Sequence, residues 1–182
     1  IEMVMADQLY FAKADLTPAM RNRLVRLAAF QNPEFHRAQA IRLSTYGIPR
    51  IISCAEEYPE HIALPRGCLP DVREFLTEHG VKLAITDERN TGTPIDATFH
   101  GELRPEQRDA VQKLAVHDIG VLAATTAFGK TVVAAWMIAQ RGVNALVVVH
   151  TKPLLEQWRE RLSMFLGLPI KEIGMFGGGK KK

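Results

Sequence analysis

The residues of this chain best suited to chemistry form a short loop between an apolar run and a helical pattern. The loop consists of Ala124, Thr125, Thr126, Ala127, Phe128, Gly129, Lys130 and Thr131. A loop between a strand and a helix aims backbone N–H groups and the positive end of the helix dipole at an anion, which gains about 0.3–2 kcal/mol there. We therefore expect this loop to bind phosphate.

The last three residues of the loop each have a role in nucleotide binding. Gly129 permits close approach of the backbone, and Lys130 can reach the β- and γ-phosphates. Thr131 offers its hydroxyl to the Mg²⁺ that bridges these phosphates. The match to the phosphate-loop pattern is incomplete, because Ala124 replaces its first glycine. The alternative is an ordinary helix start in which Lys130 is merely solvated.

The second half of the chain alternates apolar runs with helical patterns. Continuous apolar runs at Ile119–Ala124 and Asn144–Val149 indicate buried strands. Helices are predicted from Pro105, over about residues 129–141 with Gly142 as the stop, and from Pro153 to Gly167. Such alternation predicts α/β architecture, with a parallel sheet covered on both faces.

Polar side chains follow the second predicted strand. His150, Thr151 and Lys152 lie at its carboxyl end, the edge at which open α/β sheets bind ligands. A hydroxyl, an imidazole and an ammonium group ahead of a helix could contact phosphates. The competing interpretation is that Thr151 caps the helix that Pro153 begins.

The first half is predicted to be a small α+β unit. Helices are expected after Thr17-Pro18, from Asn32-Pro33 to Gly47, and over Leu69–Glu78. Short strands are expected at Ile51–Cys54, His61–Leu64 and Val81–Ile85. A turn-rich segment at residues 87–98 separates the halves, so we place the domains at 1–98 and 99–182.

The composition excludes several classes of protein. The 182 residues are 47% hydrophobic and 24% charged, which excludes intrinsic disorder. The longest uncharged stretches, Ile119–Gly129 and Thr131–Gln140, are far shorter than the roughly 20 residues of a membrane helix, and Ile1–Tyr10 does not resemble a secretory signal. Cys54 and Cys68 form no Cys-x-x-Cys pair, so we expect neither a disulfide framework nor a zinc site. We therefore expect a cytoplasmic location.

Three segments, taken in order, resemble the opening motifs of superfamily 2 helicases. They are Leu103–Gln107, Ala124–Thr131 and the stretch from Val147 to Trp158. More narrowly, roughly residues 60–182 are similar to the group of XPB-like repair helicases, UvsW-like phage helicases and restriction-enzyme motor subunits. The resemblance implies a partial RecA-like P-loop lobe, ATP and Mg²⁺ as cofactors, and DNA, single strand or duplex, as a partner.

The resemblance also implies roles for individual residues. Gln107 would read the adenine edge, whose adjacent donor and acceptor a carboxamide can match, and Arg104 would lie near the base. The alternative is a first-turn Gln107 that is solvated. The segment His150–Lys152 would contact phosphates of one DNA strand.

One position departs from the family pattern. The family usually carries glycine at the position of Ala127. If this position requires a positive φ, alanine costs about 1–2 kcal/mol. We expect a re-shaped loop, with Phe128 packed beside it.

Arginines in the first half are candidates for contact with a duplex backbone: Arg21, Arg23, Arg26, Arg37 and Arg42. Charged helix faces are usually just solvated. The segment that begins at Leu64 resembles the small amino-terminal domain of this helicase group, where it helps to recognise or distort DNA. We therefore leave two interpretations of the first domain open: it contacts DNA, or it is an accessory domain whose role is limited to packing. Residues 101–182 carry 12 Lys+Arg against 7 Asp+Glu, but Lys180–Lys182 could simply be a solvated tail.

We predict an amino-terminal fragment of an ATP-dependent DNA helicase or translocase, acting in repair, recombination or restriction. Lys130 and Thr131 would take part in ATP hydrolysis, which also needs a later acidic residue, arginines and the remaining helicase domains of the parent chain. The fragment alone is expected to be inactive. The alternatives are a P-loop kinase or ATPase of another class, and a non-catalytic DNA-binding module with a degenerate nucleotide site.

Overall fold

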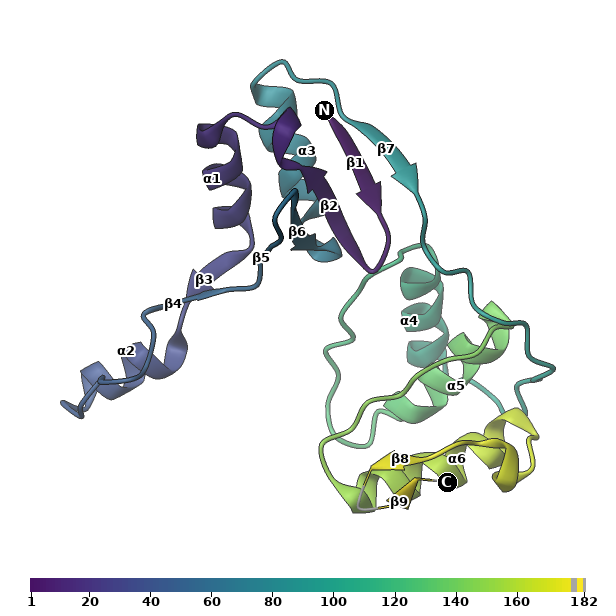
Figure 1. Ribbon diagram of the computed structural model, residues 1–182. Helices are drawn as coiled ribbons and strands as arrows, with labels where there is room; N and C mark the ends of the chain where they lie inside the picture. Colours follow the sequence, from purple (N-terminus) through teal and green to yellow (C-terminus); the bar gives the residue numbers. More distant parts are fainter. Residues whose placement is uncertain (178–179, 182) are drawn as a thin grey trace. The chain divides into compact units, whose positions relative to one another are not determined.

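The computed structural model describes residues 1–177 and 180–181. The chain divides into two compact units, Ile1–Asn90 and Thr91–Lys182, and the division falls in the turn-rich segment at residues 87–98. Figure 1 labels the elements of each unit. In the part of the chain that the structure describes, no helix is both long and apolar enough to cross a membrane.

A five-stranded mixed sheet forms the centre of the first unit, in the order β5-β6-β2-β1-β7. Its strands are β1 (Glu2–Met5), β2 (Gln8–Ala12), β5 (Glu56–Glu57), β6 (His61–Pro65) and β7 (Ala84–Asp87). Strands β1 and β7 are parallel, and the other neighbours are antiparallel. The strand predicted at His61–Leu64 is confirmed, and the one predicted at Val81–Ile85 is displaced toward β7. The β1–β2 hairpin is absent from the sequence-based prediction.

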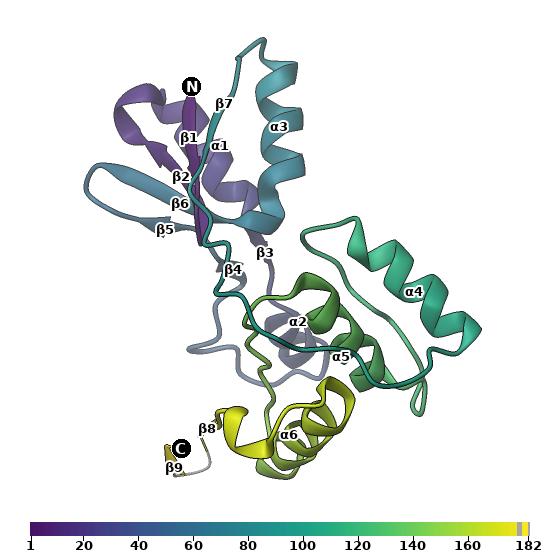
Figure 2. The same cartoon turned by 90° about the vertical axis from the view of Figure 1, so that its right-hand side faces the viewer.

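One face of this sheet is buried against two helices, α1 (Pro18–Leu27) and α3 (Leu69–Glu78), which lie on the same side of it in Figure 2. The alternation of side chains along the strands places five fully buried residues on this face: Met3, Leu9, Phe11, Ile62 and Leu64. Both helices were predicted, and the Thr17 hydroxyl caps α1 by accepting a 3.2 Å hydrogen bond from the Met20 N–H. Short 3₁₀ turns occupy Lys13–Asp15 and Arg66–Cys68.

Residues 29–53 form an arm of the first unit that pairs only with itself. It contains β3 (Ala29–Gln31), α2 (Pro33–Ala40) and β4 (Ile51–Ser53), and β3 pairs antiparallel with β4. Figures 1 and 2 show α2 beyond the end of the five-stranded sheet. Helix α2 is shorter than predicted, because Arg42 adopts a left-handed φ of 56° and the helix ends at Ala40 instead of near Gly47.

The described residues of the second unit form three α-helices, α4 (Pro105–Ala115), α5 (Lys130–Arg141) and α6 (Lys152–Leu166). Helices α5 and α6 bury Ala135, Leu162 and Leu166. Gly142 and Gly167 end these helices with φ values of 63° and 65°, as predicted. A 3₁₀ turn at Ile170–Glu172 and a hairpin of β8 (Phe176–Gly177) and β9 (Lys180–Lys181) follow. Of the predicted solvated tail Lys180–Lys182, Lys180 and Lys181 form β9, and Lys182 lies outside the described residues.

The predicted parallel sheet of the second unit is wrong. Segments 119–124 and 144–149 belong to no strand, and Val121, Leu146 and Val148 are 89%, 88% and 83% exposed. A strand requires N–H and C=O partners alongside it, and neither segment pairs with the other or with another described strand. Among the described residues, the only parallel pairing is that of β1 with β7. The protein is therefore mixed α/β, with its mixed sheet in the first unit.

Candidate nucleotide-binding site

The loop ends at the start of α5, where Gly129 is the N-cap residue with a φ of 88°. The N–H groups of Gly129, Lys130 and Thr131 have no hydrogen-bond partner within the described part of the chain. Free amides at the positive end of a helix dipole form a binding site for an anion. The helix start therefore has the backbone groups that a phosphate requires.

The side chain of Lys130 folds onto the loop. Its ammonium group donates hydrogen bonds of 2.9 Å to the carbonyl oxygens of Ala124 and Thr125. Lys130 is exposed, but its side chain is held by these two hydrogen bonds. The alternative of an ordinary helix start expects a lysine that only water surrounds. Thr126 is exposed, and its side chain makes no hydrogen bond to another described residue.

Ala127 adopts the backbone conformation that glycine favours, with a φ of 66°. The positive φ considered for this position is thus present, and the expected re-shaping of the loop stays a prediction. An alanine in this region costs about 1–2 kcal/mol. The half-buried Phe128 follows it, and its carbonyl oxygen is the acceptor through which the loop is held.

Hydrogen bonds join the loop to the start of α4. Gln107 is only 3% exposed, so the alternative of a solvated glutamine is wrong. Its Oε1 accepts a 2.9 Å hydrogen bond from the Arg104 N–H, and its Nε2 donates one of 2.7 Å to the Phe128 carbonyl. The first of these bonds caps the helix, and the second fixes the loop.

Arg104 holds the same part of the loop. Its guanidinium Nη2 donates to the carbonyl oxygens of Phe128 and Ala127, the latter at 3.3 Å. Its Nε lies 3.2 Å from a carboxylate oxygen of Glu106. We call the contacts of Arg104 and Gln107 with the loop the clasp. No sequence pattern indicates the clasp, because its acceptors are backbone carbonyls.

A Cβ at Gly129 would collide with the Nε2 atom of Gln107. Glycine is therefore required here by its positive φ and also by the close approach of the glutamine side chain.

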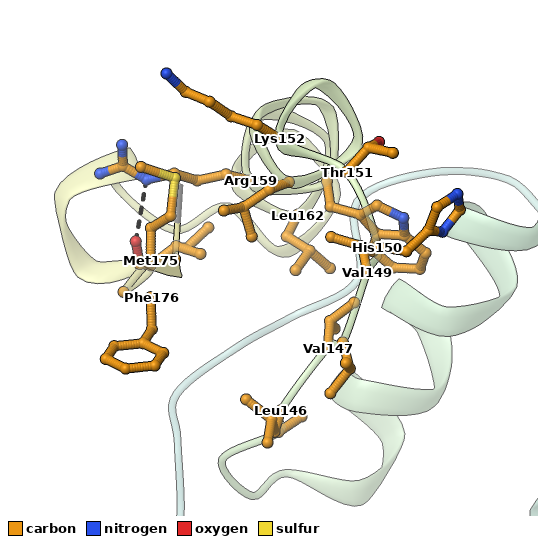
Figure 3. A pocket seen from close by; sticks show the side chains of 17 residues that line it. Leu146, Val147, Val149, His150, Thr151, Lys152, Arg159, Leu162, Met175 and Phe176 are labelled. Carbon is orange, nitrogen blue, oxygen red and sulfur yellow. Dashed lines mark hydrogen bonds between the residues drawn. The ribbon is translucent and has the colours of Figure 1, made fainter. Parts of the chain in front are cut away.

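His150, Thr151 and Lys152 are exposed at the start of α6. Thr151 is the N-cap residue of α6, but its side chain makes no capping hydrogen bond, so the capping alternative is not supported. Lys152 lies 4.0 Å from Glu156, one turn along the helix. Figure 3 shows His150 and Thr151 beside each other at the end of the extended segment that leads into the helix.

This segment forms one end of a groove of about 1200 Å³ that contains no residue of the phosphate loop. Its apolar lining comes from the extended segment and from α6, with Val147, Val149, Trp158 and Leu162. Arg159 donates hydrogen bonds of 3.0 and 2.8 Å to the carbonyls of Ile173 and Ile170, which fixes the chain on the far side of the groove. The loop and the His150–Lys152 segment are thus two separate candidate sites.

Among the described residues, no three His, Cys, Asp or Glu side chains gather as a metal site. Thr131, half-buried in the first turn of α5, remains the candidate contact for a Mg²⁺ ion that arrives with a nucleotide.

Comparisons with known proteins match the part of the chain that contains this loop. Residues 100–182 match the family described as the type III restriction enzyme, res subunit. The chain is 32% identical over 111 residues, 61% of its length, to Rad25 of Halobacterium salinarum, which bears the name of a DNA 3'-5' helicase. It is 35% identical over 79 residues, 43% of its length, to the DNA 3'-5' translocase XPB2 of Sulfurisphaera tokodaii.

The similarity of residues 100–182 to this family and to these relatives confirms the resemblance to superfamily 2 helicases of the XPB and res type that the motifs indicated. The matched segments cover 18% of Rad25 and 17% of XPB2, so the chain spans less than a fifth of the curated relatives that it matches.

Proposed function

We propose that this chain is part of an ATP-dependent DNA helicase or translocase, and that its second unit binds ATP with Mg²⁺ and contacts DNA. The observation that carries the proposal is the start of α5, where three free N–H groups, Lys130 and Thr131 meet a loop clasped by Arg104 and Gln107. ATP would supply the phosphoryl group whose hydrolysis drives movement along DNA.

Within this site, the ammonium group of Lys130 would neutralise phosphate charge. To do so, it must exchange its two hydrogen bonds to loop carbonyls for bonds to phosphate oxygens. The charged acceptor makes the stronger bond, so the exchange is favourable. Thr131 would hold the Mg²⁺ ion through its hydroxyl.

Recognition of adenine by Gln107 would require a similar exchange. Both ends of its carboxamide are bonded within the chain, one to the Arg104 N–H and one to the Phe128 carbonyl. When Nε2 of Gln107 leaves the Phe128 carbonyl, the Arg104 guanidinium can still donate a hydrogen bond to that carbonyl. The clasp therefore allows Gln107 to read a base without releasing the loop.

The DNA contact of the second unit is assigned to His150, Thr151 and Lys152. All three are exposed, and the Thr151 hydroxyl is not used for capping, so it is available to a phosphate oxygen. The names of Rad25 and XPB2 as DNA helicase and translocase support DNA as the partner.

A second candidate is a non-catalytic DNA-binding module with a degenerate nucleotide site. The internal hydrogen bonds of Lys130 are the observation that favours it, because the ammonium group must give them up before it can bind phosphate. It predicts DNA binding without ATP binding.

Calorimetric titration with Mg-ATP distinguishes the two. The wild-type chain should bind ATP, and Lys130→Ala should abolish the binding. The matched control is Lys113→Ala, because Lys113 is also an exposed helical lysine with a local partner, Asp109 at 2.9 Å. Saturable ATP binding that survives in Lys130→Ala, or no binding by the wild type, would contradict the proposed nucleotide site.

A further inference from the structure

We propose that the first unit binds a second copy of this chain, because it carries two surfaces of opposite charge that complement each other. The first surface is a cluster of aromatic and acidic side chains on the open face of the five-stranded sheet. The second consists of residues 17–53, which include α1 and the arm, and we call it the arginine surface. The inference goes beyond the proposed function and uses neither the nucleotide site nor DNA.

Aromatic rings pack together on the open face of the sheet, opposite the face that is buried against α1 and α3. Tyr58 stacks on His61 with ring centroids 4.5 Å apart, and Tyr10 meets the edge of His61 at 5.5 Å. Ala63 also lies on the open face, yet it is fully buried, because Tyr10 and Glu56 flank it on the two neighbouring strands. These side chains therefore form a packed layer over the sheet.

The hydroxyl and amide donors of this layer bond to carboxylates. The Tyr58 hydroxyl and the Gln8 amide both donate to Glu56, the amide at 3.0 Å, and the Tyr10 hydroxyl donates to Asp7 at 2.9 Å. The Oε1 atom of Gln8 is buried and has no hydrogen-bond donor among the described residues. The layer thus has acceptors and negative charge to spare, so the ligand that fits it is a cation with N–H donors. We call this layer the acidic face, and it consists of Asp7, Gln8, Tyr10, Glu56, Tyr58 and His61.

A guanidinium group suits the acidic face better than an ammonium group does. Its planar N–H groups can bond a carboxylate in pairs, and its flat face can stack on an aromatic ring. A hydrogen bond holds the Glu56 carboxylate beside the Tyr58 ring, so both kinds of contact are offered at one place. The described strand positions on this face include no Lys or Arg, so the guanidinium must come from elsewhere.

The arginine surface has such groups without partners. Residues 17–53 contain six arginines and one acidic residue, Glu34, whereas the other residues of 1–90 contain five Lys+Arg and eleven Asp+Glu. None of the six guanidinium groups makes an ion pair or hydrogen bond with another described residue. Within one copy, the arginine surface and the acidic face therefore both lack a partner, and a second copy supplies each of them. Arg21 is half-buried, and the other five arginines are exposed: Arg23, Arg26, Arg37, Arg42 and Arg50.

Large apolar side chains of the arm are exposed as well. They are Phe30 at 51%, Ile41 at 60%, Leu43 at 62%, Tyr46 at 97% and Ile51 at 58%. Protein interfaces combine an apolar centre with a polar and charged rim. The arm therefore offers a partner protein apolar area to bury in addition to charge.

The two surfaces differ, so each contact joins the arginine surface of one copy to the acidic face of another, as in a heterologous interface. A variant that lacks either surface cannot bind a further copy of itself. It can still bind a variant that lacks the other surface, because such a pair has one intact surface of each kind.

The test uses two variants of the whole chain. The arm variant, Arg37→Gln/Arg42→Gln/Arg50→Gln, removes three charges from the arginine surface, and the face variant, Asp7→Asn/Glu56→Gln, removes two from the acidic face. Sedimentation equilibrium measures self-association at low and high salt, and circular dichroism checks the fold. The protein is first freed of nucleic acid, which could otherwise bridge the arginines of two copies.

Each variant has a control with the same change in net charge. Arg66→Gln/Arg73→Gln/Lys82→Gln is the control for the arm variant, and Glu74→Gln/Glu78→Gln is the control for the face variant. All five of these side chains are exposed and lie outside both surfaces.

The wild-type chain should self-associate at low salt and dissociate at high salt, which screens exposed charges. The arm variant and the face variant should each associate at least about tenfold more weakly, and the controls should stay within about twofold of wild type. An equimolar mixture of the arm variant and the face variant should form a 1:1 complex. A mixture that associates no more than either variant alone would overturn the proposal.

Two other outcomes would overturn it as well. One is a wild-type chain that stays monomeric at low salt up to the highest concentration at which it is soluble. The other is association that neither salt nor the two variants weaken, as expected if the exposed apolar segments 119–124 and 144–149 of the second unit bind each other instead.

NMR locates the contact on the chain. The arm variant, labelled with ¹⁵N, keeps its acidic face and is titrated with the unlabelled face variant, which keeps its arginines. The amide signals of Gln8, Tyr58 and His61 should shift and saturate as the second variant is added. Shifts confined to the second unit would show that the copies meet elsewhere and would overturn the proposal.

Discussion

The side-chain amide of Gln107 donates a 2.7 Å hydrogen bond to the carbonyl oxygen of Phe128, 21 residues further along the chain. This bond links the start of α4 to the loop before α5. Because Gln107 is buried, both of its polar atoms must find partners within the protein, and they do. The same residue that would read a base therefore also stabilises the loop that would hold the phosphates.

Replacing Gln107 with alanine should destabilise the second unit by about 1–3 kcal/mol, because the substitution removes two hydrogen bonds of a buried side chain. Both tryptophans, Trp136 and Trp158, lie in this unit, so urea unfolding followed by tryptophan fluorescence reports on it alone. The control is Gln112→Ala on the exposed side of α4, which should stay within about 0.5 kcal/mol of wild type. Equal stability of the two variants would refute the structural role of Gln107.

Ala127→Gly should stabilise the second unit by about 0.5–1 kcal/mol. The alanine has a φ of 66°, so replacement by glycine relieves about 1–2 kcal/mol of strain. Part of this gain is lost, because glycine loses more backbone entropy than alanine when the chain folds. Ala110→Gly, in the ordinary helical backbone of α4, should instead destabilise it by about 0.5–1 kcal/mol. The two unfolding midpoints should move in opposite directions, and a fall in both would show that Ala127 is not strained.

Gly129→Ala should be more harmful than Gly142→Ala. Both glycines have a positive φ, but a Cβ meets Gln107 at the first position and nothing within 4 Å at the second. The collision should add about 1–3 kcal/mol to the cost of strain. In a Gln107→Ala background this excess should disappear, because the colliding atom is gone. Additive effects of the two substitutions would rule out the contact.

Tyr58→Phe should raise the pKa of Glu56. The Tyr58 hydroxyl, 2.5 Å from a Glu56 oxygen, holds the pKa of that carboxyl below 4.5, and the carboxylate raises the pKa of Tyr58 to about 12. The stabilising effect of Glu56 is therefore present above pH 4.5 and is lost as the pH falls through its folded pKa. That of Tyr58 is present below pH 10 and is lost as the pH rises through about 12.

Carboxyl titration by NMR measures the effect on Glu56. Tyr46→Phe is the control, because Tyr46 is 97% exposed and remote from this hydrogen bond. The stability difference between wild type and Tyr58→Phe should be largest near neutral pH and should shrink in acid. An unchanged Glu56 titration in Tyr58→Phe would contradict the assignment.

The helices were predictable because their signals are local. Thr17-Pro18 and Asn32-Pro33 start helices, and Gly142 and Gly167 end them, through hydrogen bonds and backbone angles within a few residues. The apolar segments at residues 119–124 and 144–149 misled the prediction, because apolar composition does not supply the neighbouring strand that a sheet requires.

The contacts within the candidate site were not predictable from the sequence, and the role of its residues in nucleotide binding stays a prediction. The motif spacing indicated Gln107 and Lys130, whose side chains both proved to be bonded to loop carbonyls. The acceptor in such a bond is backbone, which has no residue type for a sequence pattern to detect. The left-handed conformation of Ala127 was indicated only by the glycine that the family usually carries at this position, because alanine itself rarely adopts it.

Hydrogen exchange at the start of α5 tests the central claim most directly. The N–H groups of Gly129, Lys130 and Thr131 lack partners within the described chain, so they should exchange rapidly in the free protein. Saturating Mg-ATP should slow the exchange of these amides in the wild type but not in Lys130→Ala, because phosphate oxygens would become their acceptors. Unchanged exchange at these amides in the presence of Mg-ATP would contradict the assignment of this helix start as the nucleotide site.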